Sequence, residues 1–552
     1  MTLFSGALLA LAALRAPAPH VLFVLVDDLG HGNVGFHRAP GDHPPEVATP
    51  HMDALAKSGV VLNRHYVFRL CTPSRSSFIS GRFPVHVTQI LKNPEAENSG
   101  VPRNMTGIAH VLKRAGYHTH QVGKWDAGMA TPTHTPRGRG FDTSLGYFEH
   151  KNDFWTKGIM QSECMTAGNG SYGNLTDLWD TDGPAQITPQ YEEALFRDRV
   201  VSIIRHHPSP DEPLFILYTP HVAHCPLQAP DEYIERFAAL TSGDDEGVCR
   251  EQTRPSFCPL CVGPTPTWPT DKTYPCRAIY SSMVAYLDDA LGTIIGEMRQ
   301  AQLYDSSLVV LSSDNGGPIK LEESASSNHP LRGGKYSEFE GGVRATAFIS
   351  GGFIPSPLRG TTSEVVMHIA DWYATLASLA SLPYPTDHTA AASGLPPLDS
   401  VDAWPALTGR APPFTHEFIP LSDKALLEAK TGLKLLRGDQ QPAGWQGARF
   451  PNASSQAHDP SFKVVCSDDG HDGGGCLYNV SSDPHEVTDL ATAMPSELAR
   501  LNRQLAALSK TFFENSDHGV DVCPPSIDVP CACWLARHKY GGTMGPFQEV
   551  QL

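Results

Sequence analysis

The sequence predicts an α/β fold with a large, mixed but mostly parallel sheet flanked by helices. Short apolar runs that suit buried strands alternate with helical patterns along most of the chain. The runs at residues 20–28 and 308–315 both end in polar side chains, and residues 214–218 form another run between them. With 552 residues and 40% hydrophobic content, the chain can bury a large core and is long enough for more than one domain.

Two helices can be placed from their end signals and their periodicity. Thr49-Pro50 is a helix start in which an N-cap residue precedes proline, and Gly59 supplies the stop. A longer helix begins at about Arg277, because apolar residues recur three or four positions apart after it. They are Ile279, Met283, Leu287, Leu291, Ile294 and Met298.

A smaller C-terminal unit follows a boundary at the proline-rich residues 395–413. Strands are predicted at residues 433–436, 462–466 and 477–480, and a helix at residues 496–508. This order predicts a small antiparallel sheet with one helix.

The N-terminus and the cysteines favour export. The apolar run at residues 3–14 and the small residues 16–18 predict a signal peptide. This run is too short to span a bilayer, and no other segment has the continuous apolar length of a transmembrane helix. Of the twelve cysteines, Cys466 and Cys476 bracket a turn and suit a local disulfide. Cys258 and Cys261 lie in another cluster, where a zinc site is the alternative to disulfides. Sequons occur at Asn104, Asn169, Asn174, Asn452 and Asn479.

The net charge of −17 argues against nucleic acid and membrane surfaces as partners, since both call for a basic face.

The acidic residues also include a candidate metal site. Asp27 and Asp28 end one predicted strand, and Asp314 and Asn315 end another. The carboxyl ends of parallel strands meet at one edge of the sheet, and hard oxygen ligands suit Ca²⁺. The alternative is that these residues cap helices or form turns.

One motif carries more functional information than the rest of the chain. Residues 71–81 read Cys-Thr-Pro-Ser-Arg-Ser-Ser-Phe-Ile-Ser-Gly, on a turn that opens into a predicted helix. This stretch resembles the signature of the type I sulfatases. Further matches follow in order at residues 122–126, 221–230, 330–344 and 476–486. The resemblance spans about residues 20–490. It is greatest to the arylsulfatase B (N-acetylgalactosamine 4-sulfatase) branch. It implies an alkaline phosphatase-like fold.

The resemblance implies a role for each matching residue. Cys71 would be oxidised to formylglycine by the formylglycine-generating enzyme, and the hydrated aldehyde would attack sulfur and later release sulfate. Together with Asp27, Asp28, Asp314 and Asn315, residue 71 would bind Ca²⁺. The remaining roles fall on Arg75 and Lys124, which would hold the diol, on His224, which would protonate the leaving alcohol, and on Lys335, which would neutralise the sulfate.

One position departs from the family pattern. Where the family has histidine after Gly-Lys-Trp, this chain has Asp126. Either this carboxylate is the base that collapses the diol, or another histidine fills the space. His150 is the candidate, and the alternative is that it is an exposed loop residue.

These features predict a sulfatase that acts on a sulfated sugar, a polysaccharide or an aryl sulfate. The alternatives are a phosphatase or phosphonate hydrolase of the same superfamily, and an inactive protein that binds sulfated glycans. The predicted location is the secretory pathway, with a secreted, lysosomal or vacuolar destination. We divide the chain into a signal peptide at residues 1–18, a catalytic domain at residues 19–412 and a C-terminal domain with a cysteine-containing tail at residues 413–552.

Overall fold

The computed structural model describes residues 18–39, 46–96, 98–160, 162–240, 251–253, 273–319, 325–445, 462–467, 473–517 and 519–549. The predicted signal peptide and the pair Cys258 and Cys261 lie outside these residues, apart from Ala18. Among the described residues, no helix combines the length and apolar character needed to cross a membrane.

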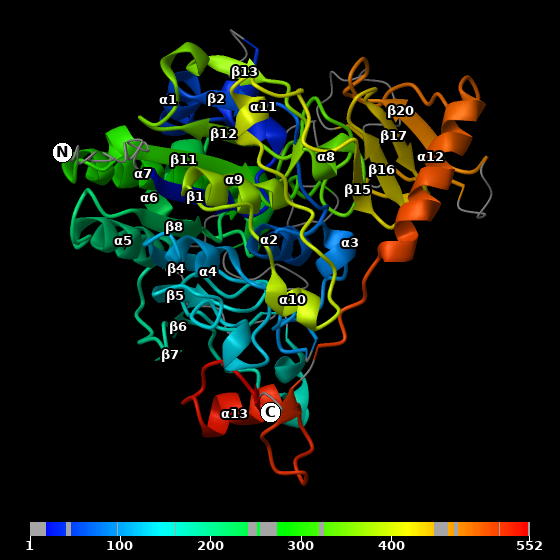
Figure 1. Cartoon of the computed structure of the whole chain (residues 1–552). Helices are drawn as coiled ribbons and strands as arrows, with labels where there is room; N and C mark the ends of the chain where they lie inside the picture. Colours follow the sequence, from blue (N-terminus) through cyan, green and yellow to red (C-terminus); the bar gives the residue numbers. More distant parts are fainter. Residues whose placement is uncertain are drawn as a thin grey trace, which may run out of the picture.

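The predicted α/β fold is confirmed by a sheet of ten strands (Figure 1). In spatial order the strands are β13 (Thr361–Ser363), β2 (Val60–Leu62), β12 (Ala347–Ser350), β11 (Ser307–Ser313), β1 (His20–Val26), β8 (Leu214–Thr219), β4 (His118–Lys124), β5 (Thr143–Tyr147), β6 (Trp179–Asp180) and β7 (Gly183–Pro184). The central run from β11 to β5 is parallel, whereas β12, β6 and β7 pair antiparallel with their neighbours. The carboxyl ends of the central strands therefore meet at one edge.

Both faces of the sheet are buried, which explains the nearly continuous apolar sequence of β1. Val21, Phe23 and Leu25 pack into one core and alternate with residues that pack into the other. The first core contains residues of α2 (Cys71–Ser80), α4 (Ile108–Lys113) and α9 (Trp372–Leu379). The second contains residues of α1 (Pro50–Ser58), α5 (Glu192–Arg205) and α7 (Cys276–Gln300). The predicted helix starts are confirmed, because α1 begins at Pro50 and α7 begins at Cys276, next to Arg277.

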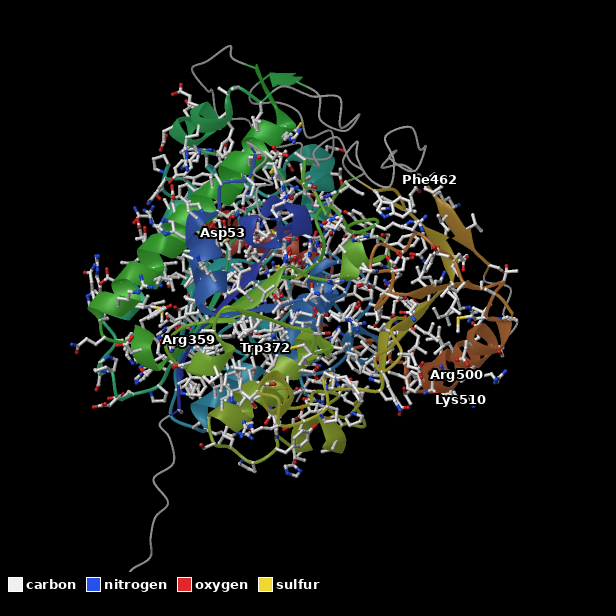
Figure 2. All side chains as sticks on the ribbon, turned by 90° about the horizontal axis from the view of Figure 1, so that it is seen from above. Asp53, Arg359, Trp372, Phe462, Arg500 and Lys510 are labelled. Carbon is white, nitrogen blue, oxygen red and sulfur yellow. A yellow bond between two sulfur atoms is a disulfide. The ribbon has the colours of Figure 1, made fainter. Side chains whose placement is uncertain are left out.

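A smaller antiparallel sheet lies beside the large one, on the right in Figure 1. Its strands are β15 (Phe418–Ser422), β16 (Ala425–Glu428), β17 (Leu433–Leu436) and β20 (Cys476–Asn479), and α12 (Pro495–Leu508) covers one face. Viewed from above, Arg500 of α12 lies at the outer side of this unit and Trp372 within the large one (Figure 2). The predicted strand near residue 464 forms a separate pair, β18 (Gly438–Gln440) with β19 (Val464–Cys466), and the predicted Cys466–Cys476 disulfide joins it to the sheet.

The C-terminal tail returns to the large sheet. Helix α13 (Cys531–His538) packs into the same core as α2, and Cys533 forms a disulfide with Cys164. A second disulfide joins Cys523 and Cys531. In Figure 1 the red tail lies below β5–β7, far from the smaller sheet. The division at residue 412 remains a prediction, and the tail contributes to the core of the large domain.

A buried cation ties the smaller sheet to the large one. Lys434 of β17 lies 2.9 Å from Glu340, the first residue of α8 (Glu340–Val343), and 2.9 Å from Glu486. Burial raises the pKa of Glu486 to about 7, whereas Lys434 and Arg344 outweigh burial and lower the pKa of Glu340. The lysine is therefore paired mainly with ionised Glu340.

Replacing this cation is expected to destabilise the protein. Lys434→Met leaves Glu340 without its main partner in a site that water does not reach, so we expect a loss of about 3–5 kcal/mol in the free energy of unfolding. Urea unfolding measures this loss. Lys424→Met, at an exposed position in the turn between β15 and β16, is the control. Equal unfolding midpoints for the two variants would show that the buried pair contributes nothing.

Candidate active site

Acidic side chains gather where β1 and β11 end. The two strands are parallel and pair Val26 with Ser313, so the residues after them are neighbours. The Asp28 amide donates to the Asp314 carboxylate at 3.4 Å, and the Asn315 side-chain amide donates to the Asp28 carboxylate at 2.7 Å. Asp27, Asp28, Asp314 and Asn315 are all at most 2% exposed. The structure thus brings together all four predicted oxygen ligands.

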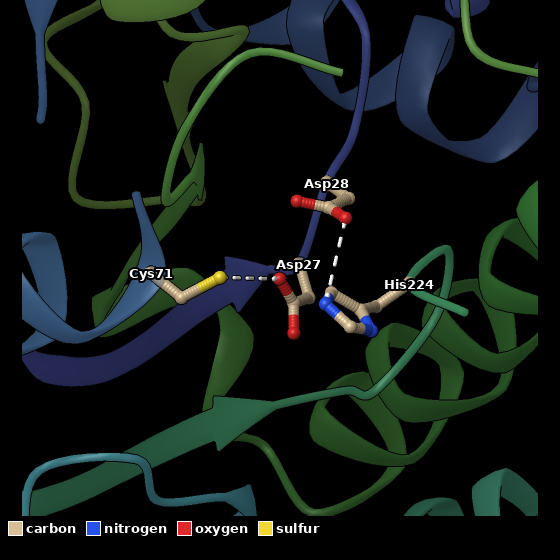
Figure 3. A group of neighbouring side chains, drawn as sticks. All are labelled: Asp27, Asp28, Cys71 and His224. Atoms are coloured by element: carbon tan, nitrogen blue, oxygen red, sulfur yellow. Dashed lines mark hydrogen bonds and ion pairs between the residues drawn. The ribbon is translucent and has the colours of Figure 1, made fainter. Parts of the chain in front are cut away.

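Cys71, the first residue of α2, lies beside this group. Its Sγ lies 3.5 Å from the Asp27 carboxylate, and a dashed line marks this contact in Figure 3. Burial raises the pKa of the thiol well above its ordinary value, and the charge of Asp27 adds to the effect. The unmodified side chain is therefore a neutral thiol and not an activated thiolate.

Three buried cations face the carboxylates. Arg75 follows Cys71 by one helical turn, so both side chains lie on the same face of α2. Its guanidinium contacts Asp314 at 2.8 Å, Lys124 contacts Asp27 at 2.6 Å, and Lys335 contacts Asp28 at 2.9 Å.

Burial alone would lower the pKa of each of these cations. The neighbouring carboxylates outweigh burial and raise the pKa of Arg75, Lys124 and Lys335. All three are therefore charged in the folded protein.

Of the two histidines in the segment at residues 221–230, His224 faces the site. Its Nε2 lies 3.7 Å from the Asp28 carboxylate (Figure 3), and its Nδ1 lies 2.7 Å from the Cys225 carbonyl. His221 instead stacks on Phe154 at 4.1 Å between ring centroids. Burial, with Lys335 adding, holds the pKa of His224 well below its usual range. The imidazole is therefore neutral, with Nδ1 as its donor and Nε2 free to accept a proton.

Asp126 and His150, predicted as alternatives, contact each other. The Asp126 carboxylate accepts hydrogen bonds from His150 Nδ1 at 3.0 Å and from the Thr72 hydroxyl at 2.7 Å. Burial would raise the pKa of Asp126, but His150 and Lys124 outweigh it and lower the pKa. His150 is 4% exposed, so it is not an exposed loop residue, and its Nε2 has no hydrogen-bond partner among the described atoms.

The oxygens at the strand ends fit a divalent cation. Asn315 Oδ1 is buried and has no hydrogen-bond partner among the described atoms. Ligand atoms of Asp27, Asp28, Cys71 and His224 all lie within 4.8 Å of one another. Burial, and after it the charge of Asp27, raises the pKa of Asp314 to about 7, because the buried site disfavours a further negative charge beside Asp27. Carboxylate and amide oxygens in this number suit Ca²⁺.

Sequence reasoning did not single out Thr72. Its hydroxyl reaches a residue 54 positions away, and only the adjacency of α2 and the end of β4 reveals the contact. The contact between Asp126 and His150 follows from the pairing of β4 with β5, because both residues come shortly after these strands, with Lys124 opposite Tyr147. The sequence alone does not reveal that pairing.

Fixed cations and hard oxygen ligands around one buried side chain suit hydrolases that act on oxyanion esters, and the sheet has the alkaline phosphatase-like architecture. Comparison with known proteins narrows this class. The chain belongs to the sulfatase family, whose model matches residues 19–382. It is a sulfuric ester hydrolase, so the predicted family and enzyme class are confirmed.

Individual relatives extend this similarity along most of the chain. Arylsulfatase J from Mus musculus is 30% identical over 521 residues, covering 89% of this chain and 76% of the relative. N-acetylgalactosamine-6-sulfatase from Sus scrofa is 24% identical over 557 residues, covering 96% and 93%. The solved structure of Ps i-CgsB in complex with k-i-k-neocarrahexaose shares the fold, with a TM-score of 0.67 at 23% identity over 90% of this chain and 94% of that chain.

Proposed function

We propose that this enzyme hydrolyses the sulfate ester of a sulfated sugar or polysaccharide, using formylglycine made from Cys71 and a bound calcium ion. The position of Cys71 carries the proposal. Its side chain lies at the start of α2, 3.5 Å from Asp27, among three cations and four metal-type ligands. A thiol whose pKa is raised by burial is a poor nucleophile, whereas a hydrated aldehyde at this atom is a good one.

The proposed reaction has two steps. In the first, one hydroxyl of the residue 71 diol gives up its proton to water and attacks sulfur. The bond from sulfur to the alcohol oxygen breaks, and protonated His224 donates its proton to the leaving alcohol. Burial keeps His224 neutral without substrate, and the negative sulfate of a bound ester raises its pKa so that it can carry that proton. Arg75, Lys124 and Lys335 stabilise the charge on the sulfate oxygens.

In the second step the other hydroxyl loses its proton, and the bond from carbon to the sulfate oxygen breaks. Inorganic sulfate leaves, and water hydrates the aldehyde again. We assign the proton transfer to His150. Asp126 fixes its Nδ1, which leaves the unpartnered Nε2 to accept a proton. Asp27, Asp28, Asp314 and Asn315 would hold Ca²⁺. The bound ion would polarise the diol and the sulfate.

The substrate class rests on the relatives. One carries the name N-acetylgalactosamine-6-sulfatase, and one solved structure holds a neocarrahexaose. We therefore propose that the substrate is a sulfated carbohydrate. This proposal does not assign the enzyme to the arylsulfatase B branch or to another branch of the sulfatase family. A phosphatase or phosphonate hydrolase of the same superfamily is the alternative activity. Membership of the sulfatase family argues against it and against an inactive glycan-binding protein.

The secretory pathway is the proposed location. The disulfides Cys164–Cys533, Cys466–Cys476 and Cys523–Cys531 suit an oxidising compartment. The sequon residues Asn104, Asn169 and Asn174 are exposed, as glycosylation requires.

The metal proposal predicts joint loss of calcium and activity. Asp28→Asn removes one anionic oxygen from the cage, so we expect calcium content to fall well below one ion per protein and sulfate release from 4-nitrophenyl sulfate to fall by at least about 100-fold. Elemental analysis of the purified protein and an assay of inorganic sulfate measure the two effects.

Asp288→Asn is the matched control, because this buried carboxylate caps α1 through the amides of His51 and Met52, away from Cys71. It should retain calcium and turnover. Full activity of the wild-type protein after thorough chelation would contradict the calcium proposal. Faster release of phosphate from 4-nitrophenyl phosphate than of sulfate would favour the alternative activity.

A further inference from the structure

We propose that Tyr336 is a substrate-binding platform, on which a six-membered ring of the sulfate ester, a pyranose or an aryl group, stacks while its sulfate reaches residue 71. The inference rests on the proposed function and adds a residue that determines specificity. Three observations on this residue support it. The side chain is exposed at the edge of a buried site, the backbone has a positive φ, and the main chain is hydrogen-bonded to the segment before Cys71.

Tyr336 marks the boundary between the buried site and solvent. Its side chain is 38% exposed, whereas Cys71 and Asp28 are at most 2% exposed and Lys335 is 4% exposed. The Lys335 ammonium lies 5.7 Å from the centroid of the tyrosine ring and 2.9 Å from Asp28. The ring therefore lies one side chain outward from the sulfate-binding cation, where the alcohol portion of a bound ester would lie.

The backbone at Tyr336 is held in a conformation that favours glycine. Residues 334–337 form a turn closed by the Ser337 amide, which donates to the Gly334 carbonyl at 3.0 Å. Tyr336 is the third residue of that turn and has a φ of 81°. This position in such turns is usually glycine, because a Cβ raises the energy. An aromatic residue kept there at a cost in stability indicates a use for its side chain.

Packing does not supply that use. The tyrosine hydroxyl makes no hydrogen bond with any residue that the structure describes, and the ring belongs to none of the hydrophobic cores found among those residues. What holds Tyr336 is its main chain. Its amide donates to the Arg69 carbonyl at 3.1 Å, and the Arg69 guanidinium donates to the Tyr336 carbonyl at 3.1 Å.

These two bonds fix the ring relative to the reacting residue. Arg69 precedes Cys71 by two residues, and its guanidinium is itself paired with Glu338 at 3.1 Å. The turn is thus tied to the segment that leads into α2, and the aromatic face keeps a set distance from residue 71. A fixed aromatic face beside a charged anchor binds a flat or chair-shaped ring by its face, while the anchor binds the anion.

The test compares ring and non-ring esters. Sulfate release from 4-nitrophenyl sulfate, N-acetylgalactosamine 6-sulfate and ethyl sulfate is measured for the wild type, Tyr336→Ala, Tyr336→Gly and Tyr336→Phe. We expect the Ala and Gly variants to raise the KM for both ring esters roughly tenfold relative to ethyl sulfate, with little change in kcat. The Phe variant should keep the wild-type selectivity, because the ring face and not the hydroxyl makes the contact.

Two controls separate binding from folding. Tyr336→Gly should melt at about the wild-type temperature, because relief of the positive φ offsets the greater freedom of the unfolded chain. Tyr384→Ala removes another exposed tyrosine, 59% exposed, and should leave the selectivity unchanged.

Equal KM changes for ring and non-ring esters, or a Phe variant that behaves like the Ala variant, would overturn the platform while leaving the sulfatase proposal intact. A wild-type protein that releases sulfate from none of the three esters would overturn both.

Discussion

Cys71→Ser is expected to abolish turnover of sulfate esters, with a loss of about 10⁴-fold or more in kcat. Serine supplies one hydroxyl where the hydrated aldehyde supplies two. A serine at this position can accept a sulfate but cannot expel it by re-forming a carbonyl. We therefore expect at most one sulfate transferred per protein molecule, with the sulfated protein accumulating. Intact-protein mass spectrometry after incubation with 4-nitrophenyl sulfate, beside a steady-state assay, measures both effects.

Ser76→Ala is a matched control on the same helix. The Ser76 hydroxyl is buried and has no hydrogen-bond partner among the described atoms, so its removal should change neither folding nor turnover. Wild-type kinetics in Cys71→Ser would contradict the formylglycine proposal. A Cys71→Ser protein that neither turns over nor becomes sulfated, with a native melting temperature, would place the nucleophile elsewhere.

The second large effect is expected at the pair formed by Asp126 and His150. His150→Ala should slow release of sulfate from the enzyme by roughly 10²–10⁴-fold, the usual scale for losing an acid–base group, and the sulfated enzyme should accumulate. Asp126→Asn should slow the same step, because the amide no longer fixes the protonation of His150 Nδ1. Since the two residues act as one unit, the double variant should be no slower than the slower single variant.

Other outcomes would assign the base differently. If Asp126→Asn traps the sulfated enzyme and His150→Ala does not, the carboxylate is itself the base. Wild-type kinetics in both variants would exclude both residues. Thr72→Val tests the support for this pair, because it removes a 2.7 Å hydrogen bond to Asp126 while keeping the shape of the side chain. We expect a smaller decrease in the same step.

The parts of the fold that were predictable are those with strong local signals. Strand β1 has buried residues throughout, and α7 has a long apolar face, so neither depends on distant contacts for its pattern. The gathering of Asp27 and Asp314 followed from one rule, that neighbouring parallel strands end at the same edge. The pairing of β1 with β11 satisfies that rule.

The parts that were missed depend on distant contacts or on weak local signals. Strand β15 contains Pro420, and a proline argues against a strand when only the sequence is known. The sheet tolerates this proline because β15 is its edge strand. Strand β5 is five residues long and includes two glycine or serine positions, so its pairing with β4 was not predicted. Without that pairing, Asp126 and His150 looked like alternatives. The Cys164–Cys533 disulfide spans 369 residues, and connectivity of that kind cannot be deduced from sequence.

The central claim is that residue 71 works as formylglycine, and mass spectrometry of one peptide tests it most directly. Trypsin should release residues 70–75, which contain this position between Arg69 and Arg75. For protein made in cells that contain a formylglycine-generating enzyme, we predict a peptide with an aldehyde at residue 71, reactive toward hydrazides, in a fraction that scales with kcat across preparations. A fully active protein whose peptide carries only an unmodified cysteine at residue 71 would contradict the account.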